Sequence, residues 1–320
     1  QRRDLTINAM ARDADGQIID PYGGQADLKA KVLRHVSTAF AEDPVRILRL
    51  ARFAARHPDF TIAPETMALT RQMVVAGEVD ALVAERVWQE LSRGLMEVCP
   101  SRMVKVLREC GALARLLPEV DRLYGVPQPV EHHPEIDTGL HLELVLDEAA
   151  TKGYGLAVRY ACLCHDLGKG TTPPQDWPRH IAHEDRSAQL AHEMALRLRV
   201  PSDCAGLAQM VAKEHTHVHR CLSLDAKGLM RLLERCDALR QPERFVGALQ
   251  ACACDARGRT GYEHIGYEQE AFLKSALAQV LAVDGAPVIA QARERGLHGP
   301  AIGEALRIAR MQALKDWLSL

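Results

Sequence analysis

The spacing of apolar positions changes near residue 40 of the chain. Before that point, short stretches at 6–11 and 17–20 flank the segment DADG at 13–16, which is typical of a hairpin turn. A third short strand is expected at 32–36. From Glu42 onward, apolar residues recur every three or four positions, which is the period of an amphipathic helix. We therefore expect two or three strands followed by a chain that is almost entirely helical.

The helical part has clear start and stop signals. Asp43-Pro44 predicts a helix start, with Asp43 as the N-cap and Pro44 at the first helical position. Pro-rich breaks occur at 125–129 and 171–174, and we place the main domain boundary at 125–136. The period predicts further helices at 64–76, 83–97, 100–110, 138–151, 156–166, 184–199, 203–214, 225–236, 242–256, 267–282 and 300–317.

Length and composition narrow the class of protein. A chain of 320 residues exceeds what one hydrophobic core usually supports, so two or more domains are expected. It contains no run of about 18 apolar residues, so no membrane span is expected. A net charge of −2 excludes binding to nucleic acid by bulk charge, but it allows a local basic face. The nine cysteines, most of them in apolar helical stretches, indicate reduced thiols in a cytoplasmic protein.

Charged residues near the N-terminus suggest a nucleotide site. In the segment Arg2-Arg3-Asp4, guanidinium groups can bind phosphate oxygens and a carboxylate can accept hydrogen bonds from ribose hydroxyls. Asp43 and Arg46 share one face of a first helical turn, so acceptors lie beside donors as on the pairing edge of a base. The same spacing also fits a capping aspartate with an i,i+3 salt bridge, and both interpretations stay open.

Four segments, in this order, resemble the motifs of tRNA nucleotidyltransferases, the CCA-adding enzymes. RRDLTINAMA resembles a strand motif, and DPYGG with the following Asp27-Leu28 resembles a flexible-loop motif. EDPVRILR resembles the nucleotide-selecting motif, and ERVWQEL resembles the motif that closes the neck. The segment GPAIG at 299–303 is similar to the tail of the bacterial enzymes that carry an added phosphohydrolase domain.

The resemblance implies a role for each matching residue. Arg3 and Asp4 would hold the ribose and triphosphate of the incoming nucleotide. Asp43 and Arg46 would pair with the base of CTP or ATP, and Arg49 lies on the same face. Glu85 and Arg86 would brace the helices around this site. The resemblance further implies tRNA, CTP and ATP as partners and Mg²⁺ for nucleotidyl transfer.

One motif of that family does not occur in this chain. It is a Gly-Ser turn followed by paired aspartates, and in the family it precedes the arginine-rich strand motif. Phosphoryl transfer with two metal ions needs those carboxylates to position the triphosphate. We therefore expect that the chain as written does not add nucleotides. Because it begins at Gln1 and its sheet is incomplete, we interpret it as the remainder of a longer protein.

A second group of residues suggests a metal site. His165-Asp166 ends a predicted helix and is followed by Leu167-Gly168-Lys169, while His141 lies 24 residues upstream and Asp255 lies far downstream. This arrangement resembles the HD phosphohydrolase pattern. The resemblance implies that His141, His165, Asp166 and Asp255 bind the metal and that His165 and Asp166 are catalytic. Two imidazoles and two carboxylates favour Mg²⁺, Mn²⁺, Co²⁺ or Ni²⁺.

Further basic residues lie near this pattern. Lys169, His183 and His215 are candidates for binding a substrate phosphate or a second metal ion. His215, His217 and His219 also fit an exposed helix end, where histidine is favourable near the C-terminal dipole.

These expectations combine into one hypothesis and two alternatives. The fold is expected to be mainly α. Residues 1–40 would be the remnant of an α/β nucleotidyltransferase head, 41–125 a helical neck and body that binds nucleotide and tRNA, and 126–320 an all-helical HD domain with C-terminal helices. The family suggests CCA addition together with 2′,3′-cyclic phosphodiesterase, 2′-nucleotidase and phosphatase activity. The alternatives are a stand-alone HD phosphohydrolase acting on nucleotides and a non-catalytic tRNA-binding module. The sequence fits either a monomer or a homodimer.

Overall fold

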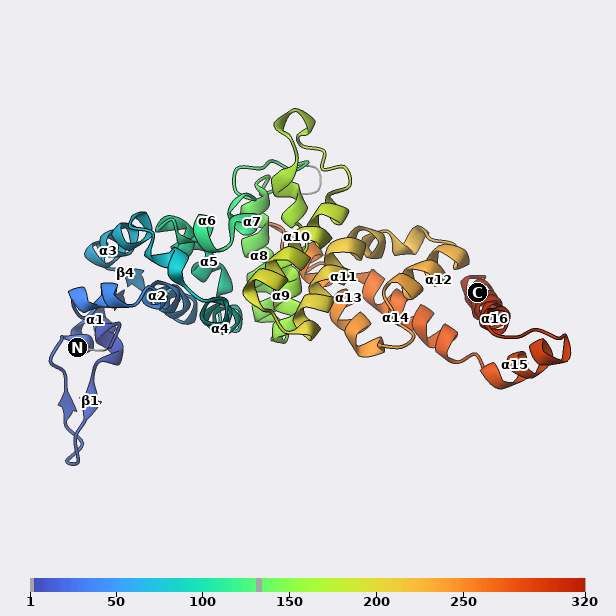
Figure 1. Cartoon of the computed structure of the whole chain (residues 1–320), viewed down its shortest axis with the longest axis horizontal. Helices are drawn as coiled ribbons and strands as arrows, with labels where there is room; N and C mark the ends of the chain where they lie inside the picture. Colours follow the sequence, from blue (N-terminus) through green and yellow to red (C-terminus); the bar gives the residue numbers. More distant parts are fainter. Residues whose placement is uncertain (1–2, 131–133, 320) are drawn as a thin grey trace.

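The described chain forms an elongated arc of helices. The computed structural model describes residues 3–130 and 134–319, so Arg2 of the arginine-rich motif lies outside the described residues. The two termini lie toward opposite ends of the arc (Figure 1). Helices dominate from residue 45 to the C-terminal end, so the expected mainly α fold is confirmed.

The strands are few and short. β1 (Ala11–Arg12) pairs antiparallel with β2 (Ile18–Ile19), as the hairpin prediction requires. The third strand, β3 (Val32–Leu33), is shorter than the expected 32–36. It pairs in parallel with β4 (Thr61–Ile62), which the pattern did not predict.

The strand expected over 6–11 is wrong except at its last residue. Thr6–Asn8 forms a short 3₁₀ helix, η1, and the strand begins only at Ala11. The buried Asp4 carboxylate accepts hydrogen bonds from the Leu5 amide and the Asn8 side chain. These side-chain bonds compete with strand pairing and turn the backbone.

A helical middle section follows the strands. Its helix α2 packs against α4 and α5. Within this packing, Arg52 Nε lies 2.7 Å from Glu90 Oε2, and both side chains are buried. The elements up to the end of this section are α1 (Gly24–Ala30), η2 (Thr38–Glu42), α2 (Val45–Arg56), α3 (Pro64–Val75), η3 (Glu78–Ala81), α4 (Ala84–Leu95), α5 (Pro100–Glu109), α6 (Ala112–Leu116) and α7 (Pro118–Asp121).

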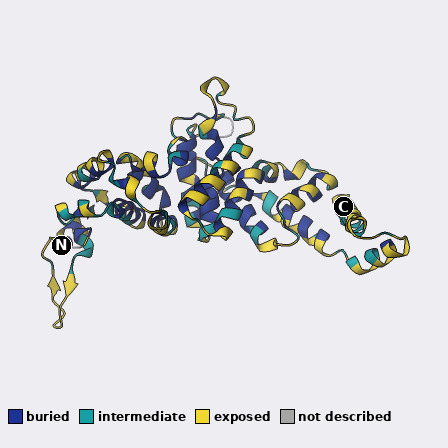
Figure 2. Cartoon of the chain, in the orientation of Figure 1, coloured by how far each residue is buried: buried dark blue, intermediate teal, exposed yellow. Residues whose placement is uncertain are grey.

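A second helical section is built around α9. This helix packs against α8, α11 and α13, while α10 packs against α11 and η4. Buried residues concentrate here, whereas the last two helices are mostly exposed (Figure 2). The elements are α8 (Thr138–Thr151), α9 (Leu156–Cys164), η4 (Leu167–Thr171), η5 (Pro174–Asp176), α10 (His183–Leu198), α11 (Ser202–His219), η6 (Cys221–Ser223), α12 (Ala226–Arg235), α13 (Pro242–Arg257), α14 (Glu268–Leu281), α15 (Gly285–Glu294) and α16 (Pro300–Leu318).

Every helix predicted from residue 64 onward is present, and two boundaries are corrected. α11 does not end near 214 but continues to His219. α2 begins at Val45 with Pro44 at the N-cap position, one residue later than predicted, and the Asp43 carboxylate accepts a hydrogen bond from the Val45 amide. The pattern did not predict α1, α6, α7 and α15, three of which are short.

Two arginines connect the two helical sections. Arg159 of α9 is buried and donates to the carbonyls of Leu95 and Glu97 at the end of α4, at 2.8 and 3.0 Å. Arg197, near the end of α10, donates to both carboxylate oxygens of Glu119 at 2.8 and 2.7 Å. A bidentate contact fixes orientation as well as distance, so the sections are held against each other at two places.

Two further expectations concern the cysteines and membrane-spanning helices. All nine cysteines are free, and all except the partly exposed Cys99 are buried. No single helix among the described residues is long and apolar enough to cross a membrane. α14 together with α15, bent by 47° at the break between them, passes that test by length and composition only.

The close approach of η4 to α10 generates a prediction for Gly168→Ala. An added Cβ would lie 2.3 Å from the His183 carbonyl oxygen and 2.6 Å from the Ser187 amide nitrogen. Because both neighbours are backbone atoms, we expect the free energy of unfolding to fall by about 1–3 kcal/mol. Chemical denaturation measures it. Gly303→Ala, in the exposed helix α16 with nothing within 4 Å of the added Cβ, is the control and should not destabilise. Equal stability of Gly168→Ala and the parent chain would contradict this packing.

Candidate functional site

Three helices bring the four predicted metal ligands together. His141 lies in the first turn of α8, His165 and Asp166 follow the end of α9, and Asp255 lies near the end of α13. Asp255 Oδ1 is 2.9 Å from His141 Nε2 and 3.6 Å from His165 Nε2. His165 Nε2 is also 3.2 Å from Asp166 Oδ2. All four residues are buried, so residues separated by more than a hundred positions in sequence form one compact cluster.

Three histidines around Asp166 are held in the same ring orientation. In each of them, Nδ1 lies within hydrogen-bond distance of a backbone carbonyl of a nearby residue. A carbonyl only accepts, so the proton sits on Nδ1 and Nε2 faces the cluster. The pairs are His165 with Cys162 at 2.8 Å, His183 with His180 at 2.8 Å and His215 with Val211 at 3.1 Å.

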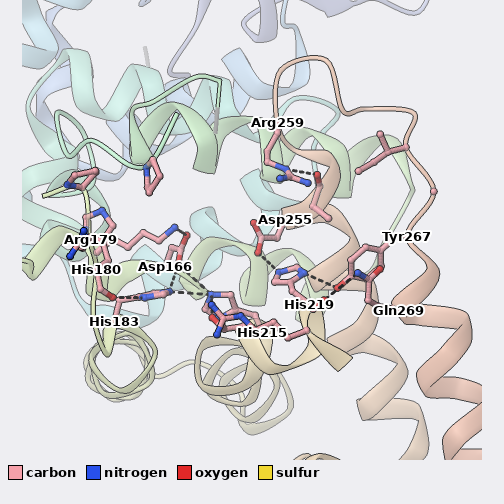
Figure 3. Close-up of a pocket in the computed structure, with 18 residues that line it drawn as sticks. Asp166, Arg179, His180, His183, His215, His219, Asp255, Arg259, Tyr267 and Gln269 are labelled. Atoms are coloured by element: carbon pink, nitrogen blue, oxygen red, sulfur yellow. Dashed lines mark hydrogen bonds and ion pairs between the residues drawn. The ribbon is translucent and has the colours of Figure 1, made fainter. Parts of the chain in front are cut away.

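The ring nitrogens opposite these anchors converge on the Asp166 carboxylate. His183 Nε2 and His215 Nε2 lie 3.3 and 3.5 Å from Asp166 Oδ1 and 3.3 Å from each other (Figure 3). Two bare ring nitrogens that face each other at this distance repel unless a cation lies near them. Histidine ligands of metals commonly donate their other ring N–H to a backbone carbonyl, which is the arrangement seen here.

Two buried atoms of the cluster lack ordinary partners. No described group makes a well-aligned hydrogen bond to His165 Nε2 or to Asp166 Oδ1, although both atoms are shielded from solvent. A buried polar atom left unpaired costs about 1–3 kcal/mol. A divalent ion would satisfy both atoms at once, so the residues present fit a metal ion.

The electrostatics of the cluster favour positive charge inside it. Burial opposes protonation of His165, but the Asp166 and Asp255 carboxylates outweigh it and raise the pKa of His165 to about 10. Burial also opposes ionisation of Asp166, but the Lys169 ammonium and His165 hold the pKa of that carboxyl well below its usual range. His165 and the hydrogen bond to His141 likewise outweigh burial and lower the pKa of Asp255. Both carboxylates are therefore charged and available as ligands.

Two other histidines of the predicted set, His141 and His215, are affected differently. Burial lowers the pKa of His215 and outweighs the hydrogen bond to Asp166. His141 is also fully buried, yet its contacts with Asp255 and Glu135 outweigh burial and raise its pKa. The Glu135 contact joins Oε1 to His141 Nδ1 at 3.0 Å, and it fixes the ring with Nε2 toward Asp255.

Lys169 lies within the cluster rather than at its rim. Its ammonium is 2.6 Å from Asp166 Oδ2 and 2.9 Å from Gln128 Oε1. An ammonium has three protons, so one remains for a ligand in the cavity. His180 also lines the cavity. Both of its ring nitrogens have partners: Nδ1 is 2.9 Å from the Thr172 hydroxyl and Nε2 is 2.9 Å from the Pro127 carbonyl oxygen. It therefore holds together two loops near the cavity.

The interpretation of residues 215–219 as an exposed helix end is wrong for two of its three histidines. His215 is buried in the cluster, and only His217 is exposed. His219 Nε2 lies 2.7 Å from Asp255 Oδ2, and its Nδ1 lies 2.8 Å from the Tyr267 hydroxyl. His219 and Tyr267 were therefore missed. The i,i+4 spacing of His215 and His219 places both on one face of α11, and this signal becomes visible only when the helix is extended to 219.

A cavity of about 530 Å³ opens over the cluster. Asp166, His183, His215 and Asp255 line its floor, while Arg179 and Arg259 line its walls (Figure 3). This volume is within the range of pockets that hold small molecules, and cationic walls suit an anionic ligand.

The residues predicted for nucleotide binding lie in the first helical section. Arg3 is exposed. Asp4 is buried, and its Oδ2 is 2.5 Å from Arg49 Nε. Burial opposes ionisation of Asp4, but hydrogen bonds from Arg49 and Asn8 outweigh it and lower its pKa.

The first turns of α2 and α4 carry the other predicted residues. Asp43 Oδ2 lies 2.8 Å from Arg86 Nη2, and the same carboxylate accepts the Val45 amide bond. Arg46 donates to the Ala39 carbonyl. Glu85 pairs with Arg199, at the end of α10. Asp43 is thus not the N-cap expected from the sequence, because Pro44 occupies that position; its carboxylate bonds to the first turn of α2 from one residue upstream, while Arg86 links it to α4.

Comparisons with known proteins agree with this arrangement. Three family models match the chain: "Poly A polymerase head domain" over residues 1–34, "Probable RNA and SrmB- binding site of polymerase A" over 59–124, and "HD domain" over 141–240. Among solved structures, a CCA-adding enzyme with ATP has a TM-score of 0.59 at 23% identity, over 98% of this chain and 68% of that chain. The Thermotoga maritima CCA-adding enzyme complexed with tRNA has a TM-score of 0.57 at 23% identity, over the same shares. These likenesses show a shared fold.

Curated protein sequences show much higher sequence identity to this chain than these solved structures do. The chain is 65% identical over 313 residues to the "Multifunctional CCA protein" of Leptothrix cholodnii, covering 98% of this chain and 75% of the relative. It is 61% identical over 322 residues to the protein of the same name from Verminephrobacter eiseniae, covering 99% of this chain and 78% of the relative. With its match to the HD domain model, the chain therefore belongs to the family of multifunctional CCA proteins.

Proposed function

We propose that this chain hydrolyses phosphoesters of nucleotides at the buried cluster where α8, α9 and α13 meet. His141, His165, Asp166 and Asp255 would hold a divalent ion, which we expect to be Ni²⁺, Mg²⁺, Mn²⁺ or Co²⁺. One observation carries the proposal: buried ring nitrogens and carboxylates converge beneath a cationic cavity, and among the described residues His165 Nε2 and Asp166 Oδ1 find no well-aligned hydrogen-bond partner. The proposed activities are those of a 2′,3′-cyclic phosphodiesterase, a 2′-nucleotidase and a phosphatase.

The ligand atoms form two overlapping groups that share Asp166. His141, His165 and Asp166 form one group and Asp166, His183 and His215 form the other, with the ligand atoms of each group within 4.8 Å of one another. We propose that the second group binds either a second metal ion or the substrate phosphate. The Nδ1 contacts of His183 and His215 with backbone carbonyls support the metal interpretation, because they orient Nε2 of each ring toward Asp166 as a ligand.

The chain's own residues explain how a phosphoester would be oriented here. A divalent ion in this ligand set polarises a phosphoryl group and lowers the pKa of a bound water. Lys169 holds Asp166 in place and directs its remaining proton toward the cavity. Arg179 and Arg259 line the cavity and are suited to non-bridging phosphate oxygens. The buried position of His165 and Asp166 limits the access of bulk water to the reacting groups.

We further propose that the first helical section selects the nucleotide for CCA addition to tRNA. Asp43 and Arg46 would pair with the base of CTP or ATP, and Arg3, Asp4 and Arg49 would hold its sugar and phosphates. Glu85 and Arg86 would brace α4, which their ion pairs support: Arg86 contacts Asp43 before α2, and Glu85 contacts Arg199 at the end of α10. Nucleotidyl transfer would use Mg²⁺. The family membership and the matched RNA-binding model support tRNA, CTP and ATP as partners.

The metal proposal predicts the behaviour of Asp166→Ala. Because Asp166 belongs to both ligand groups, its removal should weaken metal binding and slow hydrolysis of 2′,3′-cyclic AMP by about 100-fold or more. Equilibrium metal binding and the hydrolysis rate are measured on the same preparation. Asp185→Ala removes an exposed carboxylate of α10 that pairs with Lys213, and it should change neither quantity. Hydrolysis by Asp166→Ala in chelator-treated buffer would refute the site.

The nucleotide proposal predicts a loss of base selection in Arg46→Ala. With the chain joined to a nucleotidyltransferase head that carries the paired aspartates, discrimination of CTP and ATP against UTP and GTP should fall by about 1–3 kcal/mol. Incorporation of each nucleotide into a tRNA lacking its 3′ end measures it. Arg71→Ala on α3 is the control, because it removes an exposed ion pair with Glu109 of α5. Unchanged nucleotide choice in Arg46→Ala would contradict the assigned role.

A further inference from the structure

A chain of two hydrogen bonds ends on the Asp255 carboxylate and involves residues outside the metal ligand set. Tyr267 precedes the first turn of α14 and is buried, with its hydroxyl 2.8 Å from His219 Nδ1. His219 ends α11, and its Nε2 is 2.7 Å from Asp255 Oδ2. Figure 3 shows the three side chains in a row along one side of the cavity. Together they connect α14, α11 and α13 at the cavity floor.

The direction of both hydrogen bonds follows from their chemistry. The Asp255 carboxylate only accepts, so the His219 proton sits on Nε2. His219 Nδ1 is then bare, and the Tyr267 hydroxyl must donate to it. The same histidine is also held through its backbone, because Gln269 Nε2 donates to the His219 carbonyl at 3.2 Å. Two residues at the start of α14 therefore fix both the ring and the backbone of His219.

The consequence is an asymmetric carboxylate at the metal site. Asp255 Oδ2 is occupied by His219, while Oδ1 faces His141 at 2.9 Å and His165 at 3.6 Å. Rotation of the carboxylate would break the 2.7 Å contact with His219 and leave its N–H without a partner. Only Oδ1 is thus oriented toward the metal ligands.

We propose that Tyr267 and His219 are positioning residues that hold Asp255 as a one-oxygen metal ligand and keep the His219 ring from becoming a ligand itself. The inference rests on the proposed function, because it assigns these roles relative to the metal site. His219 is the inner member of the pair and Tyr267 sets its tautomer. The segment from Gly258 to Tyr267 would then contribute to metal affinity although it supplies no ligand.

Tyr267→Phe tests the proposal with Mn²⁺ as the probe. The ring stays, and only the hydroxyl that sets the tautomer is lost. We expect the Kd for Mn²⁺, measured on the 320-residue chain by electron paramagnetic resonance of the free ion, to rise about tenfold. Tyr124→Phe is the matched control, because it removes another partly buried hydroxyl that donates to a carboxylate, Glu143, at 2.9 Å. Its Kd should equal that of the parent chain.

Substitutions of His219 separate positioning from general packing. Glutamine places an amide N–H near the position of Nε2 and an oxygen that can accept from Tyr267, so His219→Gln should retain the parent Kd within about threefold. His219→Ala should weaken Mn²⁺ binding at least as much as Tyr267→Phe. Equal losses in His219→Gln and His219→Ala would overturn the proposal, because donation to Asp255 would then not matter.

Asp166→Ala, measured in the same assay, distinguishes a failure of the metal site from a failure of the positioning role. If it abolishes Mn²⁺ binding while Tyr267→Phe binds like the parent chain, the metal site stands and the positioning role is refuted. If Asp166→Ala binds Mn²⁺ like the parent chain, the metal site itself is refuted, and the positioning role with it. Loss in both, with Tyr124→Phe unchanged, supports the proposal.

Discussion

Two negative charges buried in a helical core dominate the architecture of the second helical section. Placing a carboxylate away from water costs several kcal/mol unless cations and hydrogen-bond donors surround it. Asp166 and Asp255 are both buried, and histidines from α8, α10 and α11 as well as Lys169 are arranged around them. The positions of these elements are therefore coupled, because moving any one would leave a carboxylate without compensation. A site of this kind stabilises the fold less than apolar packing would, but it is ready to accept a cation.

A buried arginine of the second helical section meets a related requirement. Arg159 is buried without a carboxylate partner in contact and donates to several backbone carbonyls, two of them at the end of α4. Burial accordingly lowers the pKa of Arg159, while the carbonyls at a helix C-terminus supply the compensating negative dipole. The carbonyls left free at the end of one helix thus become the attachment point for the next section. The residues proposed to bind the nucleotide and the buried His–Asp cluster are thus held on one connected framework.

How much the sequence predicts depends on the range of the interaction. The helices predicted from residue 64 onward follow from a local period and agree with the structure to within a few residues, except at the end of α11, whereas α6, α7 and α15 were not predicted. The strand expected at 6–11 failed because Asp4 and Asn8 bond with the local backbone, which a pattern of apolar residues does not show. His141, His165, Asp166 and Asp255 were identified through a family resemblance, and the structure brings them together. Tyr267 has no such signal, since it reaches the site from a loop 48 positions beyond its partner His219.

The length of α10 has a consequence for how this protein can change over time. Its first residue, His183, faces Asp166, while Arg197 in its last turn donates a hydrogen bond to Glu119 of the neighbouring section. An α-helix turns about 100° and advances about 1.5 Å with each residue. A single inserted or deleted residue between His183 and Arg197 would therefore rotate and shift one of these side chains away from its partner when the other kept its contact. Natural variation in length should be absent from this helix and should accumulate instead in exposed loops such as residues 295–299 between α15 and α16.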